Sequence, residues 1–443
     1  MELTEFGAVQ LARMIDAGEI TSLELTDACL ARIDSVDSDI EAWTHLDPDF
    51  ARGQAEDRDL HRATGAPCGP LHGIPIGIKD IFDTADLPTE NGTVLDAGRQ
   101  PMKDCAAVAR LKAAGAVIMG KTVTTEMAVY SPGKTKNPHD PSRTPGGSSS
   151  GSAAAVASNM VPLAIGSQTN GSMIRPASFC GVVGFKPSHG RISRAGALAL
   201  SAALDHVGIF ARAVEDAALI GDCLFGHDPA DPATAPAAAP QLSAISQQDP
   251  PAPPRLAFIK TPVWARADPA TREGFEELSD FLGDQCEEVA MPAEFDGAVD
   301  NLKSIMNADL ARYLDAYVRR GADRISDILR AMIDDGRTVS ALDYNNAVDQ
   351  IGPLRAWVET LGEEFDAIIT PAAPGEAPSG LDATGDPIFC TIWTYLGVPA
   401  VSLPLMEGEN AMPLGVQLVG AYGDDARLLR NARWLAATVA AAD

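Results

Sequence analysis

Three polar residues in this chain are of types that together could activate a nucleophile. Ser172 follows the turn-forming stretch 168–171, and Ser148 lies in a second loop rich in glycine and serine. Lys79 comes directly after a short apolar run. A neutral lysine can deprotonate a serine, either directly or through a second hydroxyl. The chain therefore holds the parts of a serine–lysine nucleophile, although spacing alone does not establish that the three residues meet.

The elements that would have to position these residues are short buried strands. An apolar run at 161–165 lies between the two loops, 146–152 and 166–175, and another run at 74–78 ends at Lys79. Such runs are typical of buried strands, and α/β proteins keep their sites in the loops at strand ends. A flexible linker is the alternative for the Gly/Ser-rich stretch, but linkers do not pass directly into AAAV and then a strand.

Lys79 allows two interpretations. An ammonium group at the end of a buried strand costs several kcal/mol unless it is paired or neutral. Lys79 could pair with Asp80 or Asp83 at the surface, or it could be buried as a neutral amine and act as a base. If the strand continues, Asp80 points to the opposite face, which favours the second interpretation. Local sequence leaves both open.

Two other motifs are disfavoured by their context. Residues 115–122 match G-x-x-x-x-G-K-T, but a phosphate-binding loop follows a strand and opens a helix, whereas here a helical pattern at 106–114 precedes a strand candidate at 116–119. Residues 147–151 match G-x-S-x-G, which would make Ser149 the nucleophile of an α/β-hydrolase. That motif follows a strand directly, yet NPHDPSRTP precedes it here. A formal alternative is a triad of Ser149 with one histidine (His189, His206 or His227) and one aspartate (Asp205 or Asp222).

Composition argues against several classes of function. The formal net charge of -27 repels phosphate backbones, so nucleic-acid binding is not expected. No run approaches the ~18 apolar residues of a spanning helix, and the acidic start MELTEFGAVQ lacks the features of a signal peptide, which indicates a cytoplasmic protein without a membrane partner. The seven cysteines are scattered and are expected as buried apolar residues, while no histidine pattern suggests a metal site; no cofactor is expected.

Several motifs along the chain resemble the amidase signature family. They are GIPIGIKD at 73–80, GAVIMGKT at 115–122, NPHDPSRTPGGSSSGSAAAV at 137–156, GSQTNGSMIRPASFCGVVGFKPSHGRIS at 166–193 and LDHVGIFARAVEDAALI at 204–220. The stretches 366–374 and 395–420 resemble the C-terminal part of that family. The resemblance covers nearly the whole chain, and the Gly/Ser-rich run is highly specific.

The resemblance implies an α/β fold, a large mixed β-sheet covered by helices on both faces, as a single domain over 1–443. Residues 1–65 would form an N-terminal helical region, 66–225 the catalytic core, and 256–443 the C-terminal part of the same domain. The Pro/Ala-rich loop between them, 226–255, is expected to bury little and to be a surface crossover or partly disordered.

The resemblance also assigns roles to the polar residues. Ser172 would be the nucleophile, Ser148 the bridging serine held across a cis peptide, and Lys79 the base. An oxyanion hole would come from consecutive residues of one loop: Thr169, Asn170, Gly171 and Ser172. The implied activity is hydrolysis of a small-molecule amide to a carboxylate and ammonia or an amine, through a serine acyl-enzyme. Alternatives are an amidotransferase subunit that delivers ammonia to a partner, and a hydrolase of carbamoyl or urea-derived compounds. A homodimer is an open alternative to a monomer.

This chain departs from the usual family motifs GGSSGGS, T-D-T-G-G-S-I-R and GKTN. The substituted positions, which have Gly, Asp, Gly and Asn in most members, are Ser150, Gln168, Asn170 and Val123. Asn tolerates a left-handed backbone better than most residues, so Asn170 is expected to preserve the loop, whereas Gln168 removes a usual ion pair. In most members the arginine lies two residues after the nucleophile, whereas Arg175 lies three residues after Ser172. This spacing resembles a malonamidase-like subgroup, in which the arginine faces the substrate's carboxylate. A loop-stabilising salt bridge is the alternative role for Arg175.

Overall fold

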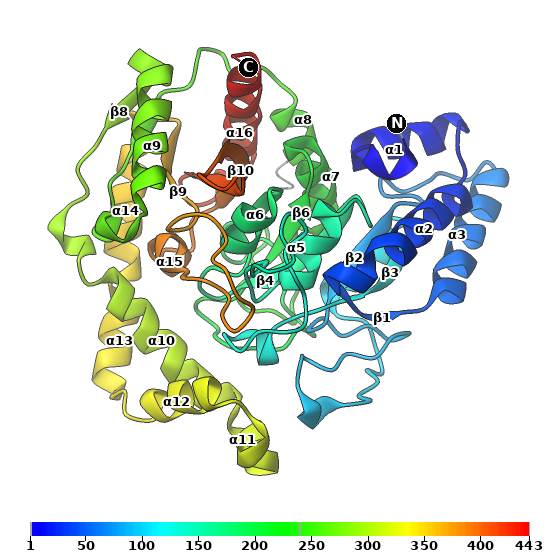
Figure 1. Ribbon diagram of the computed structural model, residues 1–443, viewed down its shortest axis with the longest axis horizontal. Helices are drawn as coiled ribbons and strands as arrows, with labels where there is room; N and C mark the ends of the chain where they lie inside the picture. Colours follow the sequence, from blue (N-terminus) through cyan, green and yellow to red (C-terminus); the bar gives the residue numbers. More distant parts are fainter. Residues whose placement is uncertain (1, 239–240, 443) are drawn as a thin grey trace.

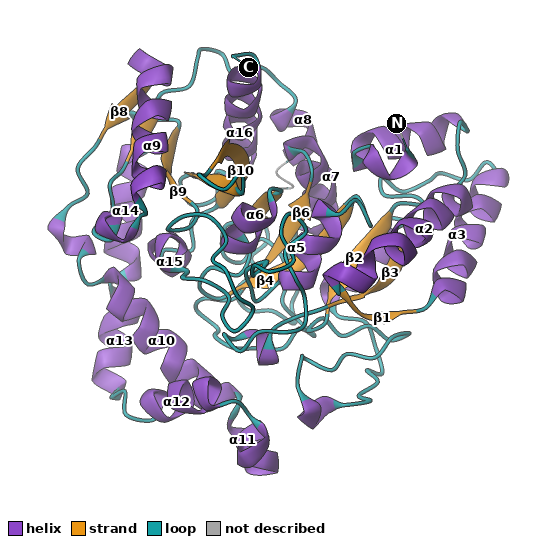
Figure 2. Cartoon of the chain, in the orientation of Figure 1, coloured by secondary structure: helices purple, strands orange, loops and turns teal. Residues whose placement is uncertain are grey.

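Within the residues that the computed structural model describes, 2–238 and 241–442, eleven strands form one mixed sheet in the order β1-β3-β2-β4-β6-β5-β10-β11-β9-β7-β8 (Figures 1 and 2). The strands are β1 Trp43–Leu46, β2 Pro75–Lys79, β3 Val117–Thr122, β4 Leu163–Gln168, β5 Val183–Lys186, β6 His206–Ala211, β7 Leu256–Phe258, β8 Cys286–Glu288, β9 Ala367–Pro371, β10 Ala400–Glu407 and β11 Pro413–Val419. The helices are α1 Ala8–Ala17, α2 Ser22–Ile40, α3 Pro48–Ala63, α4 Ala106–Ala113, α5 Ser150–Ala157, α6 Ile174–Cys180, α7 Val214–Leu224, α8 Leu242–Ser246, α9 Pro269–Leu282, α10 Ala298–Tyr313, α11 Asp315–Gly321, α12 Asp327–Gly336, α13 Ala341–Asp349, α14 Ile351–Leu361, α15 Ile388–Tyr395 and α16 Asp425–Ala440.

Strands β3, β2 and β4 run parallel beside one another, and this arrangement creates the edge on which the polar residues gather. In the β2–β4 register Ile78 pairs with Ile165, so Lys79 at the end of β2 comes level with Gly166, two residues before β4 ends. Every residue of β2 is buried, as expected of a parallel strand covered on both faces. The loops that follow β2 and β4 therefore leave the sheet at one edge.

Helices cover both faces of the sheet. Ile209 of β6 faces Gly221 of α7, whereas Gly184 of β5, which pairs with the next residue Phe210, faces Ala177 of α6. Because successive strand residues point to opposite faces, α6 and α7 lie on opposite sides. Helix α5 packs with α6, and α16 packs with α7 and β10.

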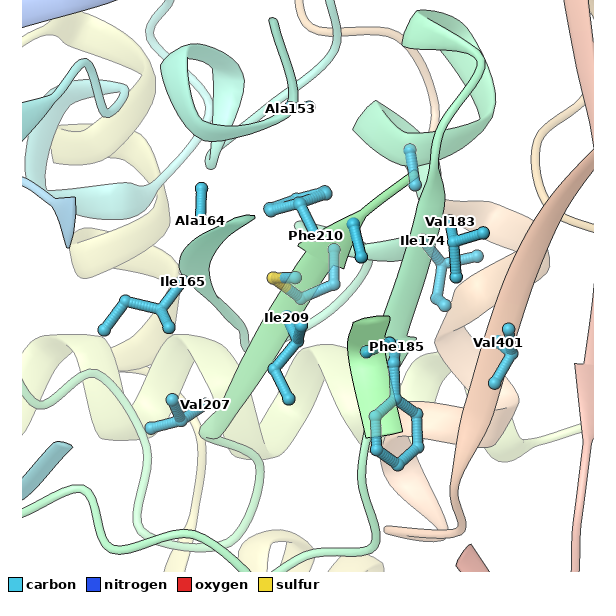
Figure 3. Close-up of a cluster of buried hydrophobic side chains, with 14 of the residues drawn as sticks. Ala153, Ala164, Ile165, Ile174, Val183, Phe185, Val207, Ile209, Phe210 and Val401 are labelled. Atoms are coloured by element: carbon cyan, nitrogen blue, oxygen red, sulfur yellow. The ribbon is translucent and has the colours of Figure 1, made fainter. Parts of the chain in front are cut away.

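The centre of the sheet carries a continuous apolar core. Figure 3 shows side chains of β4, β5, β6 and β10 together with Ala153 of α5 and Ile174 of α6. Among them, Ile165, Phe185 and Ile209 have no exposed surface. Strand β4, from which the Ser172 loop leaves, is therefore anchored in this core.

Local sequence patterns account for several individual elements of the structure. Thr21 caps α2 through a capping box with Glu24, and the Leu25, Cys29, Ile33 stripe is buried. Residues 117–122 of the G-x-x-x-x-G-K-T motif form the buried strand β3, which cannot cradle a phosphate. Residues 272–361 are mostly helical.

Two expectations need correction. The Pro/Ala-rich stretch is more ordered than expected: it contains α8, whose Leu242 is fully buried and which packs on α7 and α16, although residues 239–240 lie outside the described residues. Not all cysteines are buried, because Cys68 is exposed and Cys223 and Cys286 are half-buried. None of the described helices combines the length and apolarity that crossing a membrane requires.

Candidate active site

Lys79 is the centre of a cluster of serine hydroxyls. The side chain has no exposed surface, and its Nζ lies 2.8 Å from Ser148 Oγ, 3.0 Å from Ser149 Oγ and 2.8 Å from Ser167 Oγ. Ser148 and Ser149 come from the Gly/Ser-rich loop, and Ser167 comes from β4. The structure thus brings two of the three predicted catalytic residues, Lys79 and Ser148, into hydrogen-bond contact.

The carboxylates next to Lys79 in sequence have other partners. Asp80 lies 3.4 Å from Nζ of Lys121 on β3, and Asp83 binds Arg99 at 2.7 Å. The surface ion pair considered for Lys79 is therefore wrong, for the reason that strand geometry suggests: Asp80 points to the opposite face of the sheet.

Burial lowers the pKa of Lys79 well below its ordinary 10.5, and the buried carboxylate of Asp205 opposes this shift. A low-dielectric environment disfavours the ammonium form, and hydroxyls compensate it less than a carboxylate would. Lys79 is therefore suited to exist as a neutral amine with a lone pair, which a proton acceptor requires.

The Gly/Ser-rich loop holds its serines with backbone bonds. The Gly147–Ser148 peptide is cis, and the Ser148 carbonyl accepts a hydrogen bond from the amide of Thr125 at 3.2 Å. The Ser149 hydroxyl donates to the Ser167 carbonyl at 3.1 Å and contacts Lys79. Ser149 thus has a lysine, and not a histidine, beside it, and α5 starts at Ser150 without a strand directly before Ser149; both facts disfavour the α/β-hydrolase alternative.

Ser172 lies in a loop whose backbone amides are free. Within the described residues, the amides of 169–172 donate no hydrogen bond, while the amides of Met173 and Ile174 both donate to the side-chain carbonyl of Gln168, at 2.7 and 3.1 Å. Gln168 therefore supplies, as a neutral amide, an acceptor at the start of α6, where the family usually has an aspartate. Four consecutive amides without an acceptor could donate hydrogen bonds to an oxyanion.

Helix α15 fixes the other side of the same loop. Thr391 donates to the Asn170 side-chain carbonyl at 2.8 Å, and Asn170 donates to the Tyr130 hydroxyl at 2.9 Å. A β-carbon on Gly171 would lie 2.6 Å from Pro387, so only glycine fits beneath α15. The segment before α15 therefore reaches this loop.

Arg175 is buried and bound to protein atoms. Its Nη1 donates to the Gly385 carbonyl at 2.7 Å, and its Nη2 donates to the Gly147 carbonyl at 2.6 Å and to Thr384 Oγ1 at 3.1 Å. The side chain is 1% exposed, and its Nε has no partner in the part of the chain that the structure describes. Arg175 thus ties the Gly/Ser-rich loop to the 371–387 segment through carbonyls; the loop-stabilising salt bridge considered from sequence does not appear among these contacts.

A mostly apolar hollow opens beside Ser172. Its lining is Ala128, Val129, Tyr130, Thr169, Asn170, Ser172, Leu200, Met306 and Leu310. Ser172 is 9% exposed, and no hydrogen bond joins its hydroxyl to Ser148 among the described residues. The contact between the nucleophile and the bridging serine, which the family resemblance implies, is therefore not formed in this arrangement.

Some residues of the site were not found from sequence. Ser167 contacts Lys79 only because β2 and β4 are parallel neighbours in a particular register. Asp205, considered only as part of a histidine triad, accepts a hydrogen bond from Thr169 at 2.7 Å. A polar residue within a buried strand, as at Ser167, was the one available signal.

Comparison with known proteins shows the family to which this chain belongs. The Amidase family model matches residues 24–429, and this chain therefore belongs to the amidase signature family. It is 35% identical to a glutamyl-tRNA(Gln) amidotransferase subunit of Chloroflexus aurantiacus, covering 94% of this chain and 92% of that protein. It is 34% identical to the corresponding protein of Salinispora arenicola, over 99% of this chain and 98% of that protein.

Solved structures show the same fold. A chain from a vestigial protein complex that reveals the evolutionary origins of an s-triazine catabolic enzyme superposes with a TM-score of 0.91 at 30% identity, covering 98% of both chains. A 6-aminohexanoate cyclic dimer hydrolase superposes with a TM-score of 0.86 at 27% identity, over 99% of this chain and 98% of that one. The peptide amidase of Stenotrophomonas maltophilia superposes with a TM-score of 0.84 at 28% identity, covering 97% of this chain and 96% of that one.

Proposed function

We propose that this chain hydrolyses a small-molecule amide to a carboxylate and ammonia or an amine, through an acyl-enzyme on Ser172. The observation that carries the proposal is the buried Lys79 amine, 2.8 Å from Ser148 Oγ and without a carboxylate in contact among the described residues. A lysine in these surroundings is a base, and a serine bridge is what it needs to reach a nucleophile beyond its own contact distance.

In acylation, Ser172 Oγ attacks the amide carbonyl while its proton passes to Ser148 and the Ser148 proton passes to Lys79. The negative charge on the carbonyl oxygen is met by the free amides of 169–172. The C–N bond then breaks as the Lys79 proton returns through Ser148 to the leaving nitrogen. In deacylation, water attacks the ester carbonyl, and its proton follows the same relay to Ser172. Ser172 and Ser148 must first come into contact, which substrate binding in the apolar hollow would favour.

Two roles of Arg175 follow from its position and are separable. Its bonds to Gly147 and Gly385 would hold the serine loop in place, and this is the role that its contacts favour. Binding of a substrate carboxylate, expected from its spacing to Ser172, would require the guanidinium to exchange a carbonyl for the ligand.

A second candidate is an amidotransferase subunit that passes ammonia to a partner. The relatives from Chloroflexus and Salinispora favour it, because they cover nearly the whole chain. A hydrolase of carbamoyl or urea-derived compounds is a related candidate, favoured by the neighbour from the s-triazine context.

Ammonia release by the purified chain distinguishes these candidates. The panel should contain neutral amides, amides with a carboxyl group, carbamoyl compounds and glutamine, with Ser172→Ala as the control. Turnover of a small amide by the chain alone supports the hydrolase. Turnover only of glutamine, and only when partner subunits are added, would replace it with the amidotransferase.

A further inference from the structure

Three hydroxyls surround the Lys79 amine, but a neutral amine has only two N–H groups and one lone pair. The relay of the proposed function requires that the lone pair face Ser148, so that Ser148 donates its hydrogen to Nζ. The two N–H groups must then point at Ser149 and Ser167. Which hydroxyl donates is therefore decided by where each of the three serines places its own hydrogen.

Ser149 is already committed as an acceptor. Its hydroxyl donates to the Ser167 carbonyl at 3.1 Å, with the sulfur of Met173 at 3.8 Å as a second direction, so its oxygen can only accept from Lys79. Ser148 and Ser167 each have Lys79 as their one side-chain partner among the described residues. If Ser167 donated its hydrogen to Nζ, the lone pair would be occupied, and Ser148 could not pass on its proton.

The surroundings of Ser167 decide between these two arrangements. Ser167 is half-buried and lines a second hollow of about 200 Å³, which shares Thr169 and Leu200 with the hollow beside Ser172. The ionisable side chains in that wall are Arg194, Asp205, His206, Asp231 and Tyr313. Arg194 and Asp231 pair at 2.7 Å, and burial lowers the pKa of His206 and favours its neutral form. The remaining acidic group is Asp205: burial raises its pKa, while hydrogen bonds from Thr169 and from the amides of Leu200 and Ser201 favour its carboxylate form. A hydroxyl hydrogen in this hollow is attracted toward the carboxylate side and away from the amine.

We propose that Ser167 is a positioning residue of the relay: by accepting a hydrogen bond from Lys79 and turning its own hydrogen into the Asp205 hollow, it directs the lysine lone pair at Ser148. The inference rests on the proposed function. It also makes Ser167 one of three acceptors of the protonated lysine, so its hydroxyl stabilises the ammonium form that appears during acylation.

The experiment compares Ser167→Val with Ser167→Thr. Valine and threonine have the same shape, and the adjoining hollow has room for the added methyl group, so the pair isolates the hydroxyl. Kinetics on the best amide of the panel and labelling of Ser172 by a serine-directed phosphonate are measured across pH. Ser150→Ala is the matched control, because Ser150 directly follows Ser149, at the start of α5, and its hydroxyl donates to the Val123 carbonyl, at 3.4 Å, and not to the lysine.

For Ser167→Val we expect kcat to fall about 10- to 100-fold, the usual worth of one hydrogen bond to a charged group, with KM nearly unchanged. The acid limb of the pH–rate profile of this variant should move to lower pH by about one unit, because the ammonium form of Lys79 has lost one hydrogen-bond acceptor. Ser167→Thr should keep the wild-type rate and limb, and Ser150→Ala should change neither.

Two results are decisive and independent. If wild-type Ser172 is not labelled and no amide is hydrolysed, the proposed function fails. If Ser172 is labelled but folded Ser167→Val matches Ser167→Thr in rate and acid limb, the positioning role is overturned while the function stands. Should Ser167→Val melt at a much lower temperature than Ser167→Thr, labelling well below its melting temperature gives the same comparison.

Discussion

Lys79 and Lys121 lie on neighbouring parallel strands, and both side chains are completely buried. Lys121 has Asp80 at 3.4 Å and donates to the Phe82 carbonyl and to Thr89. Lys79 has three hydroxyls and, among the described side chains, no carboxylate in contact. Burial lowers the pKa of both, but in Lys121 the nearby Asp80 charge opposes the shift directly, whereas the pKa of Lys79 lies well below 10.5.

The difference separates a structural lysine from a reactive one. A buried ion pair adds little net stability, because desolvation offsets the attraction, but breaking it is costly, since removal of one partner leaves the other charge buried and unpaired. A neutral buried amine that contacts only hydroxyls leaves no unpaired charge in the interior, and its lone pair can accept a proton. The predictions below change one side of this comparison at a time.

The largest expected effect is on turnover by Ser172→Ala. The variant should lose at least ~10⁴-fold in kcat, the scale of a lost nucleophile, and remain folded because Ser172 is a loop residue outside the apolar core. Ammonia release and thermal melting check it. If more than about a hundredth of the rate survives, given that scale, the relay from Lys79 ends at another residue.

Lys79→Met should come next, with a loss of orders of magnitude in the rate of Ser172 labelling and of turnover. Lys121→Met, on the adjacent strand, should retain substantially more activity when assayed below its melting temperature. Equal losses in the two variants would remove the distinction between the lysines.

For the free energy of unfolding we expect the opposite order, with Lys121→Met losing more than Lys79→Met. Lys121→Met leaves the Asp80 carboxylate buried without its partner, and we expect the free energy of unfolding to fall by about 3–5 kcal/mol. Lys79→Met should cost less, because it strands hydroxyls that can turn to carbonyls or water. Denaturant unfolding measures both, and adding Asp80→Asn to Lys121→Met should recover part of the loss. A larger loss for Lys79→Met would mean that Lys79 is the structural residue.

The smallest effect concerns Arg175. If its guanidinium binds a substrate carboxylate, Arg175→Lys should weaken kcat/KM by about 1.5–3 kcal/mol on amides with a carboxyl group and spare neutral amides. If it holds the loop through Gly147 and Gly385, both substrate types should lose equally. A wild-type preference for neutral amides would end the carboxylate role.

The comparison also shows what sequence could and could not predict. Local pattern and family resemblance are enough to recognise Lys79 at the end of a buried strand, Ser148, and the loop 169–172. Strand alternation is enough to assign Asp80 to the opposite face of the sheet. The pairing of Asp80 with Lys121 and the contact of Lys79 with Ser167 depend on which strands are neighbours and in what register, which no local window contains.

Other features that the sequence did not predict depend on contacts between residues far apart in the chain. Arg175 meets Gly385 and Thr384, and Asn170 meets Thr391, across more than 200 residues of chain. The order of the Pro/Ala-rich stretch is similar, since the burial of Leu242 depends on helices α7 and α16 packing around it.

The most direct test of the neutral-base account is the pH dependence of kcat/KM in the wild type and in Lys79→Met. Protonated Lys79 has no lone pair, so activity should be low in acid and should rise as Lys79 loses its proton, at a pH well below 10.5 because burial lowers its pKa. The residual activity of Lys79→Met should lack this limb. An identical acid limb in the variant would contradict the account and assign the titrating base to another group.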